Sequence, residues 1–177
     1  LGDVYKRQSH ERVSIIEVMG RNAGYLALWC GIANGAEDIL LPEKYDYDEQ
    51  RIINNIIDNR KKGKKHHIII NAEGIGHSQA MAKRIEAATG IETRATILGH
   101  MQRGGTPTCK DRVYASIMGA KAVDILLEGK TKRVICYRDG EYIDMDINEA
   151  LAMKKSISEY QYEVSYSLSH NYSKNNQ

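Results

Sequence analysis

The sequence has 177 residues, of which 42% are hydrophobic and 27% are charged, and its formal net charge is +2. This composition is typical of a globular protein, and so balanced a charge gives no reason to expect a nucleic-acid partner. Three cysteines without a Cys-x-x-Cys pair indicate reduced thiols, and no apolar run is long enough to span a bilayer, so no membrane partner and a cytoplasmic location are expected.

The first part of the chain predicts strands that alternate with helices. Residues 12–18 are rich in β-branched side chains and predict a buried strand, and a turn at 19–21 leads into a helix at 24–33. A helix start directly after a strand offers backbone N–H groups to a phosphorylated or polyhydroxylated ligand. A short strand at 38–41 follows. Asp46 stands three residues before Glu49, as in a capping box, and predicts the start of a helix that runs to about residue 61 with inward isoleucines at 52, 53, 56 and 57.

The pattern then repeats. Residues 67–72 predict a strand, 78–89 a helix that Gly90 ends, and 92–98 a strand that carries Arg94. Successive strand–helix units predict an α/β fold with a doubly wound, mainly parallel sheet and helices on both faces. Glu73 follows the strand at 67–72, so its carboxylate is expected at the sheet edge where such folds bind ligands.

The later part predicts a long helix, a hairpin and a final helix. The helix spans 108–128 and carries an apolar stripe, expected to be core, at Val113, Ile117, Ala120, Val123 and Leu127. Strands at 133–137 and 141–144 are joined through Asp139-Gly140, a dipeptide suited to a tight turn. Residues 146–154 predict the last helix, and the polar residues beyond 168 predict a frayed tail.

The most informative segment lies between the strand at 92–98 and the long helix. Its sequence, Gly99-His100-Met101-Gln102-Arg103-Gly104-Gly105, places an imidazole, an amide and a guanidinium before two glycines, which is the makeup of an anion site. By residue type alone, an ordinary charged loop explains it equally well. Likewise, Arg21 by itself fits an exposed ion pair, and the run of lysines at 61–65 fits a solvated helix end.

Residues 99–107, together with Glu17-Val18-Met19-Gly20-Arg21-Asn22-Ala23-Gly24 and Ala72-Glu73-Gly74, resemble the bacterial ATP-dependent 6-phosphofructokinases in residues, order and spacing. The resemblance extends from Ser9 to about Leu168 and matches the C-terminal part of such an enzyme. It implies transfer of the γ-phosphoryl group of ATP, with Mg²⁺, to fructose 6-phosphate to give fructose 1,6-bisphosphate. It also implies that the glycine-rich nucleotide loops and the catalytic aspartate lie upstream, so the chain alone is expected to be inactive.

The resemblance implies a substrate site. His100 and Arg103 would hold the 6-phosphate, and Glu73 with the turn at 19–21 would hold the sugar. Arg12 and Arg94 would reach the 6-phosphate of a neighbouring subunit, and Arg21 would also help electrostatically at the reacting end; no catalytic base or metal ligand is assigned to this chain. The full implied set is Arg12, Met19, Gly20, Arg21, Glu73, Arg94, His100, Met101, Gln102 and Arg103.

The resemblance further implies an effector site for ADP or phosphoenolpyruvate between subunits of a homotetramer. Its residues would be Gly35, Ala36, Glu37, Lys62, Lys64, Lys65 and His66. The lysines would bind the anion, and Glu37 would suit the Mg²⁺ of the nucleotide.

The implied domain organisation divides the chain into four kinds of segment. Residues 1–8 do not match the family and are expected to be a non-native leader. Residues 9–101 and 153–168 would form the sugar-phosphate domain, 102–152 would pack with a nucleotide domain, and 169–177 would be the tail. A pyrophosphate-dependent relative, a non-catalytic sugar-phosphate or nucleotide-binding module, and a nucleic-acid role for the lysine run remain alternatives.

Overall fold

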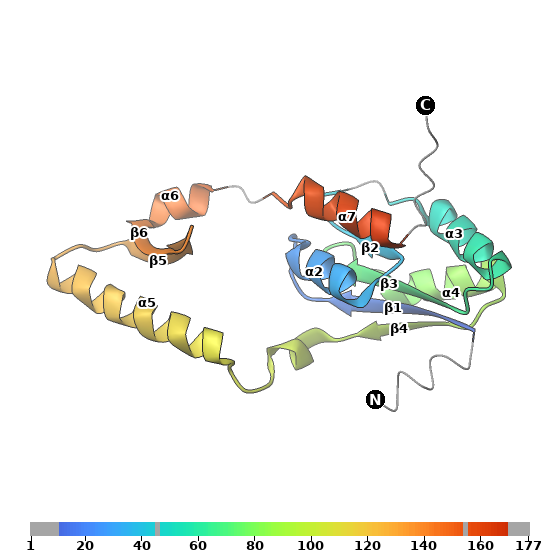
Figure 1. Ribbon diagram of the computed structural model, residues 1–177, viewed down its shortest axis with the longest axis horizontal. Coiled ribbons are helices and arrows are strands. Elements are labelled where there is room, and N and C mark those ends of the chain that lie inside the picture. Colours follow the sequence, from blue (N-terminus) through green and yellow to red (C-terminus); the bar gives the residue numbers. More distant parts are fainter. Residues whose placement is uncertain (1–10, 45–46, 154–155, 170–177) are drawn as a thin grey trace. The chain divides into compact units, whose positions relative to one another are not determined.

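The computed structural model describes residues 11–44, 47–153 and 156–169. The chain divides into two units, Leu1–Arg103 with Ser156–Gln177, and Gly104–Lys155. The elements of the first unit are β1 (Arg12–Val18), α2 (Tyr25–Asn34), β2 (Asp38–Leu40), α3 (Glu49–Lys61), β3 (His66–Ala72), α4 (Ser78–Thr89), β4 (Thr93–Ile97), the 3-10 helix η1 (Gly99–Arg103) and α7 (Glu159–Ser169) (Figure 1).

The first unit is built on a four-stranded parallel sheet in the order β2-β3-β1-β4. Each connection between these strands crosses over through a helix, as parallel pairing requires. The two central strands read as apolar β-branched runs, and Ile15 and Ile69, which are paired across them, are both fully buried. The sheet therefore has a core on each face.

Helices cover both faces of this sheet. On one face, α3 and α4 place Ile52, Ile56 and Ile85 against β1 and β3. On the other face, α2 contributes Ala27 and Leu28, and Ile157, just before α7, joins the same cluster. This arrangement confirms the predicted α/β fold with a doubly wound parallel sheet.

Two local predictions in the first unit are wrong. Helix α3 is capped by Asp48, whose carboxylate accepts hydrogen bonds from the N–H groups of Gln50 and Arg51, and Asp46 lies outside the described residues. The last helix is α7, which the sequence did not predict. Its sequence shows no clear apolar period, and the helix is held instead by packing of Tyr162 and by an ion pair between Lys44 and Glu159.

The second unit holds α5 (Cys109–Leu127), β5 (Arg133–Arg138), β6 (Glu141–Asp146) and α6 (Ile147–Ala152). The antiparallel hairpin turns at Asp139 and Gly140, which both have positive φ, as predicted. Helix α6 ends two residues earlier than predicted, and Lys154 lies outside the described residues. Ser169, which was predicted to belong to the tail, is the last residue of α7, and the rest of the predicted tail, residues 170–177, lies outside the described residues.

The apolar stripe predicted to be core on α5 is exposed in this chain. Tyr114 packs against Tyr137 and Tyr142 of the hairpin. Ile125 lies three turns along the same face of α5, and among the described residues it is the one buried residue of this helix. A two-stranded hairpin can cover only one face of a helix. The stripe lies on a neighbouring face and stays exposed, at Val113, Ile117, Ala120, Val123 and Leu127.

Candidate functional site

Three of the predicted segments meet at one edge of the sheet. The turn at 19–21 follows β1, Glu73 follows β3, and η1 follows β4, and these three strands are parallel neighbours. The last residues of β1 and β3, Val18 and Ala72, are paired in register, so the segments that follow them leave the sheet side by side. This is the carboxyl edge, where parallel α/β sheets bind ligands.

Glu73 is bonded directly to the turn. Its Oε1 accepts hydrogen bonds from the N–H of Gly20, at 3.0 Å, and from the N–H of Arg21. These bonds, that of Arg21 first, lower the pKa of the Glu73 carboxyl, and the guanidinium charges of Arg21 and Arg103 act in the same direction. Glu73 is therefore a carboxylate at neutral pH, with positive groups around it.

Two close backbone approaches fix the shape of the turn. Gly20 has φ +150°, and a Cβ at this position would lie 2.3 Å from the carbonyl oxygen of Ala23. At Gly74, beside Glu73, a Cβ would lie 2.3 Å from the carbonyl oxygen of Arg21. Glycine is thus required on both sides of the contact, and Arg21 itself has φ +50°.

Helix η1 is tied to the same turn. The Oε1 of Gln102 accepts a hydrogen bond of 2.7 Å from the N–H of Met19. His100, Met101 and Arg103 are exposed, so their side chains are available to a ligand at this edge. The structure therefore joins Glu73 to Gly20 and Arg21, and Gln102 to Met19, by direct hydrogen bonds. His100, Met101 and Arg103 lie on the same short helix as Gln102.

Other polar residues near this edge were missed by sequence reasoning. The two carboxylate oxygens of Glu43 accept hydrogen bonds from the N–H of Gly24, at 2.8 and 3.0 Å. The sequence suggested that the N–H groups at the start of α2 bind a ligand, but this one is already bonded to Glu43. Below the edge, Ser78 donates to Glu17 at 2.6 Å and accepts from the buried side-chain amide of Asn71 at 2.7 Å. No sequence signal reveals these contacts, since they join residues 7 to 61 positions apart.

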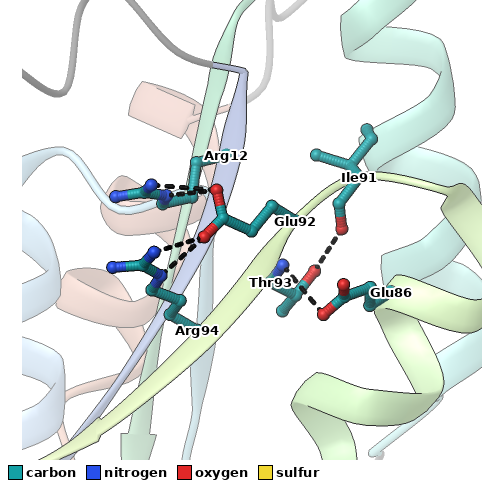
Figure 2. A network of polar contacts seen from close by, with 6 residues as sticks. All are labelled: Arg12, Glu86, Ile91, Glu92, Thr93 and Arg94. Atoms are coloured by element: carbon teal, nitrogen blue, oxygen red, sulfur yellow. Dashed lines mark hydrogen bonds and ion pairs between the residues drawn. The ribbon is translucent and has the colours of Figure 1, made fainter.

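Arg12 and Arg94 lie at the opposite, amino edge of the sheet. Both contact the carboxylate of Glu92: the shortest nitrogen–oxygen distances are 2.9 Å from Arg12 and 2.6 Å from Arg94 (Figure 2). The two arginines lower the pKa of the Glu92 carboxyl, Arg12 more than Arg94. The length of β1 separates them from His100 and Arg103, so one chain does not bring the two groups into one site.

The residues predicted for an effector site lie around the starts of β2 and β3. Glu37 is buried; its Oε1 pairs with the Lys64 ammonium at 2.6 Å, and its Oε2 accepts from the N–H of Ile68. Lys62 caps the end of α3, Gly35 caps the end of α2 with φ +61°, and Ala36 follows it. Lys64, Lys65 and His66 line a shallow hollow that Arg12 also borders. Glu37 and Lys64 are thus brought together, whereas both oxygens of Glu37 are already engaged.

Within the described part of the chain, no three His, Cys, Asp or Glu side chains are grouped so that they could hold a metal ion. The described helices also include none that is both long and apolar enough to cross a bilayer.

Comparisons with known proteins agree with the resemblance of the motifs. The sequence model of the family "Phosphofructokinase" matches residues 5–126. An "ATP-dependent 6-phosphofructokinase" of Clostridium botulinum (strain Loch Maree / Type A3) is 52% identical over 161 residues, which are 91% of this chain and 50% of the relative. "ATP-dependent 6-phosphofructokinase 1" of Clostridium perfringens (strain 13 / Type A) is 57% identical over 160 residues, which are 90% of this chain and 50% of the relative.

A solved structure with a similar fold is also a phosphofructokinase. The structure of phosphofructokinase from Saccharomyces cerevisiae matches with a TM-score of 0.75 at 29% sequence identity, covering 94% of this chain and 23% of that one. This chain spans about half the length of the curated relatives that it matches. A family match over more than half of its residues, joined to this likeness of sequence and fold, shows that the chain belongs to the phosphofructokinase family.

Proposed function

We propose that this chain supplies the fructose 6-phosphate-binding part of an ATP-dependent 6-phosphofructokinase. The observation that carries the proposal is the convergence of the turn at 19–21, Glu73 and η1 at the carboxyl edge of the sheet. The names of the relatives at 52% and 57% identity favour ATP as the donor. We propose a cytoplasmic location on the same grounds, since the named activity belongs to glycolysis.

In this proposal, charge and hydrogen bonding position the sugar phosphate. The exposed His100 and Arg103 bind the 6-phosphate, for which a guanidinium offers two parallel donors. Glu73 has one oxygen bonded to the turn, and its Oε2, which makes no hydrogen bond to the described residues, accepts one from a sugar hydroxyl. The Arg21 side chain extends from the same turn and would stabilise negative charge at the reacting end.

Phosphoryl transfer depends mainly on such positioning and on charge stabilisation. The kinase family uses ATP, which suggests a divalent metal, and Mg²⁺ would then supply charge neutralisation of the phosphates. We propose no Mg²⁺ ligand and no catalytic base among the residues of this chain, because the resemblance assigns these roles to other parts of a phosphofructokinase. We accordingly expect no phosphoryl transfer from the chain alone in a coupled assay.

The two outlying groups of residues suit an assembly. Arg12 and Arg94, which lie far from His100 within one chain, would serve the 6-phosphate bound by a neighbouring copy in a homotetramer. The hollow lined by Lys64, Lys65 and His66 would bind ADP or phosphoenolpyruvate as an effector. A metal ion bound by Glu37 would first have to displace the Lys64 ammonium.

Calorimetric titration of the chain with fructose 6-phosphate tests the substrate assignment. Arg103→Ala should weaken binding about tenfold to a hundredfold, because a charge-assisted hydrogen bond contributes about 1.5 to 3 kcal/mol. Arg138→Ala, which removes an exposed arginine of the hairpin, is the control and should bind as the unchanged chain does. Equal affinities for Arg103→Ala and the unchanged chain, or no binding by either, would contradict the proposal. Unphosphorylated fructose should bind much more weakly throughout.

A further inference from the structure

Glu92 forms the centre of a three-residue cluster at the amino edge of the sheet. Arg12 donates to its Oε2 from Nε at 3.2 Å and from Nη2 at 2.9 Å, and Arg94 donates to its Oε1 from Nε at 2.6 Å. Each carboxylate oxygen therefore has its own guanidinium, and Figure 2 shows the two arginines converging on Glu92 from adjacent strands. A phosphate group would present oxygens to the same two guanidiniums.

The sheet enforces this geometry. Glu92 immediately precedes β4, and Arg94 lies two residues later on the same face. The N–H of Val13 donates to the carbonyl of Glu92 at 3.0 Å, which places Arg12, the residue before Val13, beside it. The corner is also held from the other face, where the buried Thr93 donates to the carbonyl of Ile91 at 2.9 Å (Figure 2).

The contacts within the cluster are exchangeable. The side chains of Arg12, Glu92 and Arg94 are 29%, 42% and 63% exposed, and ion pairs in contact with water stabilise a protein only weakly. An incoming anion can therefore reach both guanidiniums. It has to replace Glu92, which is attached to the chain and so competes at a high effective concentration.

We propose that Glu92 is an internal competitor at an anion site formed by Arg12 and Arg94. It occupies both guanidiniums until an anion displaces it, so it lowers the affinity of the site for every anion, and a phosphate-monoester dianion displaces it more readily than a monoanion does. The inference rests on the proposed function in one respect, the assignment of these two arginines to a phosphate group. With Glu92 in place the cluster carries a net charge of +1. A monoanion would only replace one negative charge by another, whereas a dianion neutralises both arginines. Lys65, which borders Arg12 in the adjacent hollow, adds positive charge that favours the dianion further.

The test compares methyl phosphate with methyl sulfate, two anions of similar size. At pH 7 a phosphate monoester, whose second pKa is about 6, is mainly a dianion, while methyl sulfate is a monoanion. Each is titrated into the ¹⁵N-labelled chain, and binding is followed at the Nε–H signals of Arg12 and Arg94. We expect the unchanged chain to bind methyl phosphate about tenfold or more tightly than methyl sulfate, as one additional charge-assisted interaction predicts.

Glu92→Gln removes the competing charge and keeps the side-chain shape. It should tighten binding of methyl phosphate and of methyl sulfate, each by about tenfold, because neither anion then has to displace a charged hydrogen-bonded carboxylate. Glu86→Gln is the matched control, because Glu86 lies at the same corner and accepts from the N–H of Thr93 without contacting either arginine (Figure 2). It should leave the affinities for both anions unchanged.

Two results would overturn the inference. In the first, Glu92→Gln leaves the affinity for methyl phosphate unchanged or weakens it, which would mean that Glu92 only orients the arginines. The proposed function would then still stand if Arg94→Ala abolishes the response of the Arg12 signal to methyl phosphate. In the second, neither arginine responds to either anion in any variant, and the assignment of Arg12 and Arg94 to a phosphate then fails as well. Binding of fructose 6-phosphate that depends on Arg103 is measured separately and is untouched by either result.

Discussion

Replacing Gly20 by alanine should destabilise the first unit strongly. The loss should exceed that of the same replacement at a positive-φ glycine whose added Cβ would point into open space. The residue has φ +150°, a region that costs side-chain-bearing residues about 1 to 3 kcal/mol. The new Cβ would also lie 2.3 Å from the carbonyl oxygen of Ala23, a backbone atom that has to move. Moving it strains the turn hydrogen bond of 2.9 Å from the N–H of Ala23 to Gly20, at a cost of about 0.5 to 1.5 kcal/mol.

Together these effects predict a loss of about 1.5 to 4.5 kcal/mol in the free energy of unfolding. Gly90→Ala is the control, because Gly90 has φ +67° and no atom within 4 Å of the added Cβ. It should lose only the cost of left-handed backbone, about 1 to 2 kcal/mol. Urea unfolding followed by the fluorescence of Trp29, on the helix that begins after the turn, measures both variants in the same unit.

The comparison also has a functional readout. Gly20→Ala should separate the backbone N–H groups of the turn from Glu73 and abolish fructose 6-phosphate binding, while Gly90→Ala should bind normally at the same temperature. Equal losses of stability in the two variants would refute the steric reasoning. Unchanged sugar-phosphate binding by Gly20→Ala would show that the shape of the turn does not matter for the ligand.

Three further outcomes are expected. Arg84, by hydrogen bonding to Glu49, lowers the pKa of that carboxyl, so the Glu49–Arg84 pair stabilises the folded chain above about pH 4.3 and loses this contribution as the pH falls. In urea unfolding at a series of acidic pH values, the stability of Glu49→Gln should therefore fall less steeply with pH than that of the unchanged chain. Thr108→Ala removes the capping box of α5 and should cost about 1 kcal/mol, measured by hydrogen exchange of the α5 amides, with no effect expected at β1. The exposed apolar stripe of α5 should make the chain self-associate in light scattering, and Val123→Lys should lower this self-association; unchanged scattering would show that the stripe does not mediate it.

Local sequence patterns accounted for most elements of this protein. The β-branched run at 12–18 became a central strand, and the isoleucines at 52, 53 and 56 became the buried face of α3, because burial on one or two faces imposes its period directly on the sequence. The motifs at 17–24, 72–74 and 99–107 were sufficient to place the chain in its family. Their meeting at one edge followed from the parallel sheet, since parallel strands end at the same edge.

Only the tertiary structure decided which groups are paired. Helix α7 has little periodicity of its own and forms against its neighbours, and the stripe on α5 is exposed because the hairpin packs on the adjacent face. The register of the strands brings Glu73 into hydrogen-bond contact with Arg21, 52 residues away, and Glu92 into contact with Arg12, 80 residues away. A local sequence pattern cannot predict such pairs, because a hydrogen bond depends on the distance between two atoms in space. For residues far apart in the sequence, the fold sets that distance.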